Sequence, residues 1–140
     1  MTASEARGWR VLDSHAVLAL LMDEPGADIV RDLLREASPE PPHLVMSVVN
    51  LGEVFYRLMR VHGATAAERF LAEFEALPVT LFEVDWALAR HAAELKAAHP
   101  IAFADCIAAA LAIRLEAPLV TGDPEFRRVQ HLLEVHWLPR

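Results

Sequence analysis

The chain of 140 residues is the size of one domain, and a single cysteine rules out an internal disulfide. The formal net charge of −7 argues against a protein that coats nucleic acid through bulk positive charge. The longest apolar run, Cys106 to Ile113, is far shorter than the roughly 18 residues that span a bilayer, and the first nine residues lack the apolar segment of a secretory signal. We therefore expect one cytoplasmic domain over residues 1–140, with no membrane segment.

Short apolar segments alternate with amphipathic ones along the chain, and glycine, proline and capping residues separate them. In the first part of the chain, the expected elements are a strand over 10–13, a helix capped by Ser14, a helix over 27–37 and a loop over 38–42. Next come a strand over 44–47, a helix capped by Ser47 or Asn50 that runs through Val61 to a stop at Gly63, and a helix from Thr65 to Leu77. The last part is expected to hold a strand over 79–84, a helix from Asp85 toward His99, a helix over 103–117, a strand over 118–122 and a helical segment capped by Asp123.

Strands separated by helices indicate crossover connections between parallel strands. A parallel sheet is stable only when helices cover both of its faces. The pattern therefore predicts an α/β protein: a single-domain, three-layer sandwich with a mostly parallel central sheet.

Acidic residues occur where such a sheet gathers its ligands, outside the carboxyl ends of the strands. Asp13 ends the first expected strand, and Asp123 follows the last one. Asp105 lies in the first turns of an apolar helix, and Glu53 lies about two turns into the helix that leaves the second strand. The four acids are therefore expected at one rim.

Four carboxylates at one rim would repel one another, which would raise their pKa values and lower stability unless a cation compensates. Hard oxygen ligands of this kind suit Mg²⁺ or Mn²⁺, which are usually shared between a few carboxylates and the phosphates of a substrate. This interpretation predicts a metal-dependent site for phosphoryl chemistry.

Each acid also has a purely structural interpretation. Asp123 before Pro124 is typical of a helix N-cap, and Asp105 could merely complement a helix dipole. Glu53 could be a solvated helical acid. Asp13 fits a structural role least well, because Ser14 already offers a cap.

Cys106, inside an apolar helical run, is expected to be a core residue rather than a nucleophile.

Four motifs occur in order along the chain: VLDSHAVLALL, SVVNLGEVFYRL, FADCIAAALA and VTGDPEF. In their order and separation they resemble the PIN-domain ribonucleases, in particular the VapC-like toxins of bacterial toxin-antitoxin pairs, over nearly the whole chain. The resemblance implies that Asp13, Glu53, Asp105 and Asp123 hold Mg²⁺ or Mn²⁺, and that the Thr121 hydroxyl neighbours Asp13.

The resemblance also implies the function: a metal-dependent endoribonuclease that hydrolyses RNA and is held inactive by a cognate antitoxin. Asp13 or Asp105 would accept the proton of the attacking water. Family members often carry Ser or Thr three residues before the third acid, whereas this chain has Ala102, so the helix start is expected to be frayed or capped by water.

Two further expectations concern partners. The alanine-rich helix over 104–113 would allow close packing of two copies, which predicts a homodimer. Four arginines near the acids in the sequence are candidates for contacts with RNA phosphates: Arg57, Arg60, Arg127 and Arg128.

The alternative to an enzyme is a non-catalytic α/β interaction module whose acids cap helices and pair with arginines.

Overall fold

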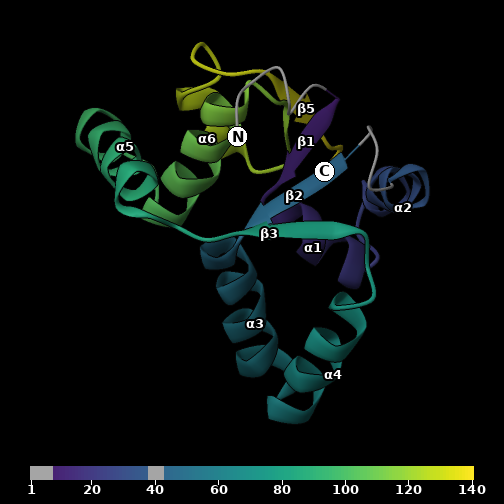
Figure 1. The fold of residues 1–140 in the computed structure, drawn as a ribbon. Coiled ribbons are helices and arrows are strands. Elements are labelled where there is room, and N and C mark those ends of the chain that lie inside the picture. The colour runs from purple at the N-terminus through teal and green to yellow at the C-terminus, as the bar shows by residue number, and fades with distance from the viewer. Residues whose placement is uncertain (1–7, 38–42) are drawn as a thin grey trace.

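The structure, a computed structural model, describes residues 8–37 and 43–140. Its centre is a five-stranded sheet in the order β3-β2-β1-β4-β5, in which every neighbouring pair is parallel (Figure 1). The strands are β1 (Trp9–Leu12), β2 (His43–Ser47), β3 (Val79–Phe82), β4 (Leu119–Thr121) and β5 (Val135–Trp137). The loop expected over 38–42 and most of the N-terminal segment expected to lack a signal lie outside the described residues.

Six α-helices and one 3₁₀ helix connect the described strands. They are α1 (Ser14–Leu21), α2 (Ala27–Glu36), α3 (Val48–His62), α4 (Ala64–Phe74), α5 (Trp86–Ala98), α6 (Phe103–Leu115) and the 3₁₀ helix η1 (Pro124–Arg128). Across the described ranges, no one helix has both the length and the hydropathy to cross a membrane, although α5 and α6 meet that test jointly as a pair bent by 119°.

Side chains of the sheet alternate between two cores. Val11, Val45 and Leu119 belong to a buried cluster with residues of α5 and α6. Their chain neighbours Leu12 and Val120 belong to a second buried cluster with residues of α1 to α4. Helices therefore cover both faces of the sheet, and the expected three-layer α/β architecture is confirmed.

Helix α6 lies inside the protein. Ala108, Ala109 and Ala110 are completely buried, and so is Cys106, which confirms its place in the core. The small side chains let α6 lie close to the sheet while α5 packs on its other side (Figure 1). The alanine stretch that suggested a homodimer is therefore already covered within one chain, and the homodimer stays a prediction without that support.

The strand β5 is not among the elements expected from the sequence, and the helical segment expected at Asp123 is a 3₁₀ helix. β5 pairs with β4 through Leu119 opposite Val135, but its three half-buried residues are too few to show an alternating pattern in the sequence. Asp123 and Pro124 do begin a helical segment, and it is a short 3₁₀ helix.

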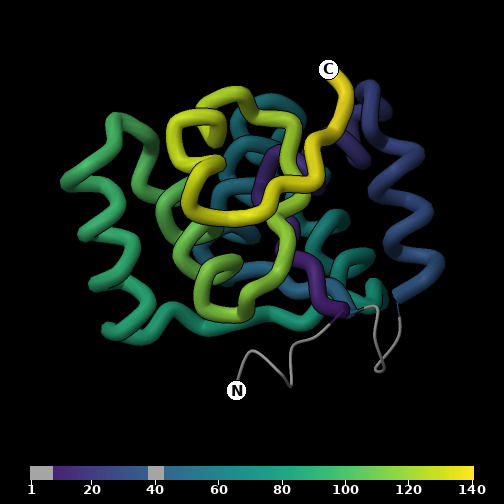
Figure 2. The backbone as a smooth tube through the Cα atoms, turned by 90° about the horizontal axis from the view of Figure 1, so that it is seen from above, coloured from purple at the N-terminus to yellow at the C-terminus, as the bar shows by residue number. Residues whose placement is uncertain are grey.

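The C-terminal end of the chain packs beside the start of α2 (Figure 2). Gly26, the N-cap of α2, has a φ of +102°, and a Cβ at this position would lie 3.1 Å from the Cβ of Leu138. Glycine is required here both by the backbone conformation and by the close approach of the C-terminal segment.

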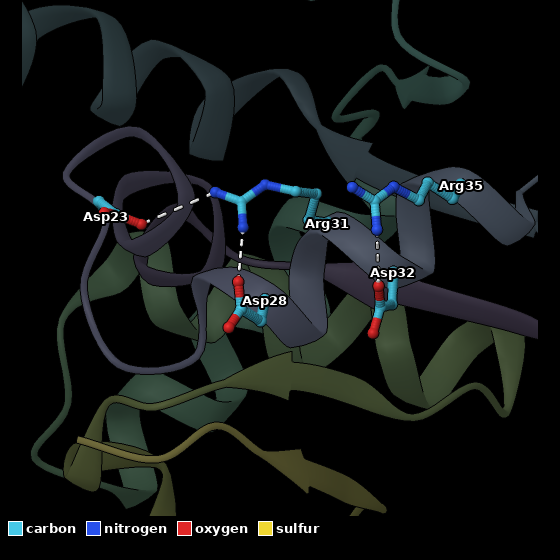
Figure 3. A network of polar contacts seen from close by, with 5 residues as sticks. All are labelled: Asp23, Asp28, Arg31, Asp32 and Arg35. Atoms are coloured by element: carbon cyan, nitrogen blue, oxygen red, sulfur yellow. Dashed lines mark hydrogen bonds and ion pairs between the residues drawn. The ribbon is translucent and has the colours of Figure 1, made fainter.

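Ion pairs lie along the exposed face of α2, and one of them reaches the turn before this helix (Figure 3). Arg31 lies 2.6 Å from Asp28 in the first turn of α2 and 3.7 Å from Asp23 in the preceding turn. Arg35 pairs with Asp32 at 3.2 Å. Exposed pairs of this kind each contribute at most about 1 kcal/mol, so they orient the turn more than they stabilise the fold.

The strand order of the sheet reverses between β1 and β4, although all the strands are parallel. From β1 the chain proceeds through β2 to β3 on one side, and then returns to β4 and β5 on the other. The carboxyl ends of β1 and β4 therefore leave the sheet as neighbours, at the switch point where parallel sheets bind ligands.

Tight packing of α6 generates a stability prediction. Ala109→Leu should lower the free energy of unfolding by about 1 to 3 kcal/mol, because three extra carbon atoms have no space in a filled core. Urea unfolding followed by circular dichroism measures this change. The matched control is Ala93→Leu on the exposed face of α5, which should leave stability nearly unchanged; equal effects of the two variants would contradict the packing described for α6.

Candidate functional site

Asp13 lies at the carboxyl end of β1, and the residue is 1% exposed. It is itself the N-cap of α1, because its Oδ1 accepts the Ala16 backbone N–H at 2.8 Å. Its Oδ2 accepts a hydrogen bond from the Thr121 hydroxyl. The expectation that Ser14 caps this helix is wrong: the Ser14 hydroxyl instead donates to Glu53 Oε1.

The end of β4 forms the opposite wall of the site. The buried Thr121 hydroxyl, besides donating to Asp13, accepts the Asp123 backbone N–H at 3.0 Å. Asp123 Oδ1 in turn accepts the Glu125 N–H at 2.9 Å, so Asp123 caps η1 as the sequence predicts. Capping leaves the second carboxylate oxygen of Asp123 available for another interaction.

Glu53 reaches the same region from α3. Its side chain is 11% exposed, and its two oxygens bind the Ser14 hydroxyl and the Arg57 guanidinium, the latter at 3.2 Å. Glu53 is therefore not a solvated helical acid. The i,i+4 spacing of Glu53 and Arg57 on one helix face produces the ion pair.

Asp105 lies in the first turn of α6 and is 8% exposed. As expected, Ala102 provides no side-chain cap for this helix. Two other hydrogen bonds hold the helix start: Asn50 Nδ2 donates to the Ala104 carbonyl at 3.1 Å, and Lys96 Nζ donates to the Ile101 carbonyl at 2.7 Å.

Asn50 is a structural residue that the sequence indicates only as an alternative cap. Ser47 is the N-cap of α3, accepting the Asn50 N–H at 3.0 Å, and its hydroxyl donates to Asn50 Oδ1 at 2.6 Å. The buried amide of Asn50 is thereby fixed with its Nδ2 toward α6. Asn50 thus links the helix that carries Glu53 to the helix that carries Asp105.

His15 is a second residue that sequence reasoning did not select. Its Nδ1 accepts the Gly122 backbone N–H at 3.2 Å, which fixes the half-buried ring against the segment between Thr121 and Asp123. A Cβ on Gly122 would lie 2.6 Å from His15 Cε1, so only glycine permits this contact. Burial lowers the pKa of His15, partly offset by the nearby charge of Asp123.

Burial and mutual repulsion act on the carboxylates. Burial raises the pKa of Asp13 to about 7; its hydrogen bonds oppose the shift, and the charges of Asp105 and Asp123 add to it. Burial also raises the pKa of Asp105 to about 7, with repulsion from Asp123 and Glu53 adding to it. Desolvation is therefore the larger cause and repulsion the smaller one, but repulsion connects all four acids. The structure brings together the residues that the sequence predicts at one rim.

The donor set fits a hard divalent cation in its chemistry, because it consists of carboxylate oxygens in a poorly solvated place where their negative charges oppose one another. As the side chains are placed, however, the residues described here include no group of three or more His, Cys, Asp or Glu that could hold a metal ion. The acids are close enough for their charges to interact but do not form a closed shell of ligands, so binding a cation would require side-chain movement.

The candidate arginines have varied contacts. Arg57 pairs with Glu53, and Arg128 lies 3.7 Å from Glu125. Arg60 lies over the ring of Tyr56 at 5.0 Å, and Arg127 over that of Trp137 at 5.9 Å. Contact with RNA phosphates stays a prediction for all four.

Comparison with known proteins identifies the family. The family model described as the PIN domain matches residues 10–132. The chain belongs to the PIN domain family. Asp13 and Thr121 lie at the switch point of the PIN domain sheet, between β1 and β4. The charges of Asp105 and Asp123 act on Asp13, and the charge of Glu53 acts on Asp105. No match is found among curated proteins.

Several solved structures share this PIN fold. VapBC2 from Rickettsia felis, bound to a DNA fragment from its promoter, is 17% identical with a TM-score of 0.71 and covers 94% of this chain and 99% of its own. VapBC-1 from nontypeable Haemophilus influenzae is 21% identical with a TM-score of 0.71, covering 92% and 97%. Mycobacterium tuberculosis VapC20, a toxin that cleaves the sarcin-ricin loop, is 21% identical with a TM-score of 0.69, covering 86% and 94%.

The raised pKa values generate a pH-dependent stability prediction. The pKa of Asp105 is about 7 in the folded chain, whereas an ordinary aspartate has a pKa of 3.8, so stability should fall as pH rises from about 4 through 7. Asp105→Asn removes the buried charge. It should melt about 3 °C or more above the wild type at pH 8, and the gap should shrink toward pH 4, as measured by calorimetry in EDTA.

The control for this prediction is Glu73→Gln on the exposed end of α4, which should melt like the wild type at both pH values. A melting difference for Asp105→Asn that is the same at pH 4 and pH 8 would show that the Asp105 charge is not destabilising.

Proposed function

We propose that this PIN domain protein is a metal-dependent endoribonuclease that acts as the toxin of a toxin-antitoxin pair. The observation that carries the proposal is the gathering of Asp13, Glu53, Asp105 and Asp123 at the switch point of the sheet, where burial and mutual repulsion raise two of their pKa values. A protein that keeps several acids in such a place needs a positive ligand to use them in their charged form.

Asp13, Asp105, Glu53 and Asp123 would hold the cation, Mg²⁺ or Mn²⁺. When bound, such a cation supplies a water of lowered pKa and stabilises negative charge that develops on the phosphate oxygens. The hydrogen bonds from Thr121 and Ala16 keep the Asp13 carboxylate oriented, and Arg57 does the same for Glu53.

The reaction is hydrolysis of an RNA phosphodiester. Water attacks phosphorus, one P–O ester bond breaks, and the leaving oxygen takes a proton. Asp13 or Asp105 would accept the proton of the attacking water, because a carboxylate beside that water can act as a general base.

The toxin assignment is supported by the similar structures. VapBC-5 from Mycobacterium tuberculosis is described as a member of the VapBC family of toxin-antitoxin systems, VapBC2 and VapBC-1 share that family name, and VapC20 is described as a toxin that cleaves the sarcin-ricin loop. We extend to this chain a cognate antitoxin that covers the site and an RNA substrate. The second candidate is a non-catalytic interaction module, which the capping hydrogen bonds of Asp13 and Asp123 and the Glu53–Arg57 ion pair favour.

Cleavage in a divalent cation tests the enzyme. The purified protein with Mn²⁺ should cleave single-stranded or structured RNA, and EDTA should stop the reaction. Asp13→Asn should lose activity by about 100-fold or more, because it removes a charged ligand from the site. Gel analysis of end-labelled RNA measures both effects.

Asp32→Asn is the matched control, since Asp32 lies on the exposed face of α2 and pairs only with Arg35 among the described residues (Figure 3). It should cleave like the wild type. The absence of cleavage by the wild type, or equal activity of Asp13→Asn and the wild type, would favour the interaction module. Cleavage that survives EDTA would contradict the proposed metal dependence.

Expression in a bacterial host tests the toxin assignment. The wild type should arrest growth, whereas Asp105→Asn at the same expression level should not, because the variant lacks an acid proposed to hold the cation. Colony counts after induction measure the difference. Arrest by both proteins would separate toxicity from RNA cleavage and would contradict the assignment.

A further inference from the structure

A cavity of about 290 Å³ opens beside the acidic site, between α1 and α3. Its apolar wall consists of Leu18 and Met22 at the end of α1, together with Val61 on α3. A volume near the lower limit of ligand pockets, about 300 Å³, suits one small ring system rather than a long segment of chain.

Two residues join this cavity to the acids. Arg57 lines the cavity and lies 3.2 Å from Glu53. His15 also lines it, and its Nδ1 accepts the Gly122 N–H next to Asp123. Because Nδ1 is an acceptor, the neutral ring carries its proton on Nε2, which leaves His15 a hydrogen-bond donor.

The polar groups of the cavity differ in charge from the acidic site beside it. Two guanidinium groups, Arg57 and Arg60, are present, and Arg60 is further held by its stacking over Tyr56. In a chain with a formal charge of −7, this places positive charge where an anion could approach the acids. Apolar walls beside guanidinium groups suit a base with its phosphate.

Glu24 is the acidic residue of the cavity. It lies in the turn between α1 and α2, where its backbone N–H donates to the Ala19 carbonyl at 2.9 Å. The neighbouring Asp23 is bound by Arg31 of α2 (Figure 3), so the turn that presents Glu24 is anchored on both sides.

We propose that this cavity binds one nucleotide of the RNA next to the scissile phosphate and selects guanine. The proposal rests on the proposed ribonuclease function and adds its base preference. Arg60 and the His15 Nε2–H bind phosphate oxygens, the base lies against Leu18, Met22 and Val61, and the Glu24 carboxylate contacts its Watson–Crick edge.

Guanine follows from the chemistry of a carboxylate, which only accepts hydrogen bonds. Guanine presents two adjacent donors, N1–H and N2–H, that match the two carboxylate oxygens. Adenine and cytosine present one amino donor beside a ring nitrogen lone pair, and uracil presents one N–H between two carbonyls. A carboxylate repels those lone pairs, so it discriminates against the other three bases.

Nucleotide binding without catalysis tests this site. Guanosine 3′,5′-bisphosphate and uridine 3′,5′-bisphosphate have the same phosphate groups, and calorimetric titration in EDTA compares their dissociation constants. The wild type should bind the guanosine compound about five- to tenfold more tightly. Glu24→Ala should reduce the ratio below about twofold, and Arg60→Ala should weaken both compounds by about five- to tenfold.

The matched controls are Glu94→Ala and Arg90→Ala, an ion pair on α5 across the sheet, which should leave both constants unchanged. Equal affinity of the wild type for the two compounds, or no effect of Arg60→Ala, would overturn the proposal. If variants of the cavity residues release a bound antitoxin but keep their affinity for nucleotides, the cavity binds a protein rather than RNA, and this result too would overturn the proposal.

The experiment separates this proposal from the proposed function, because it requires neither metal nor cleavage. Selective binding with no RNA cleavage by the wild type would keep the cavity and reject the enzyme. Cleavage in Mn²⁺ with unselective nucleotide binding would keep the enzyme and reject the cavity. If the wild type both cleaves RNA and binds selectively, Glu24→Ala should lose the preference for guanine at the cleavage site.

Discussion

The desolvation of two acidic side chains, Asp13 at the carboxyl end of β1 and Asp105 in the first turn of α6, is the constraint on which the arrangement of the site depends. Asp13 is almost completely buried, so its charge can be kept only through the Thr121 hydroxyl and the Ala16 N–H, and even these leave its pKa raised to about 7. A domain gains no stability from acids placed in this way, because removing charge from water costs more than two hydrogen bonds return. Stability therefore does not explain the placement, and this is the reason for proposing a functional site here.

The sequence predicts the features that depend on local pattern. Asp13 at the end of an apolar strand and Asp123 before a proline are visible as positions, because strand ends and caps have strong local signals. The contacts that decide what these residues do are not local. The sequence indicates Ser14 as a cap, but its hydroxyl binds Glu53, 39 residues away along the chain, and Asn50 binds a carbonyl 54 residues away. No periodicity encodes such pairings, and the half-buried β5 is too short to show one.

The four acids are not held equally. Asp13, Glu53 and Asp123 each bind the hydroxyl or backbone N–H of a neighbouring residue. The side chain of Asp105 makes no hydrogen bond with the described residues and is positioned through its helix, which Asn50 ties to α3. A rigid set with one less restrained carboxylate explains how the acids can share a space without forming a closed shell. The free oxygens of Asp105 are those best able to move toward a cation.

Arg57 connects the acids to the space around them. Its guanidinium pairs with Glu53 and opposes the rise in the pKa of Asp105, so without a cation it supplies part of the missing positive charge. Its side chain is 53% exposed, which makes the ion pair weak enough to exchange. A cation that binds Glu53 and a phosphate that approaches from the cavity would therefore both favour release of Arg57 from Glu53. The cation would displace the guanidinium from the carboxylate, and the phosphate would give it a new partner.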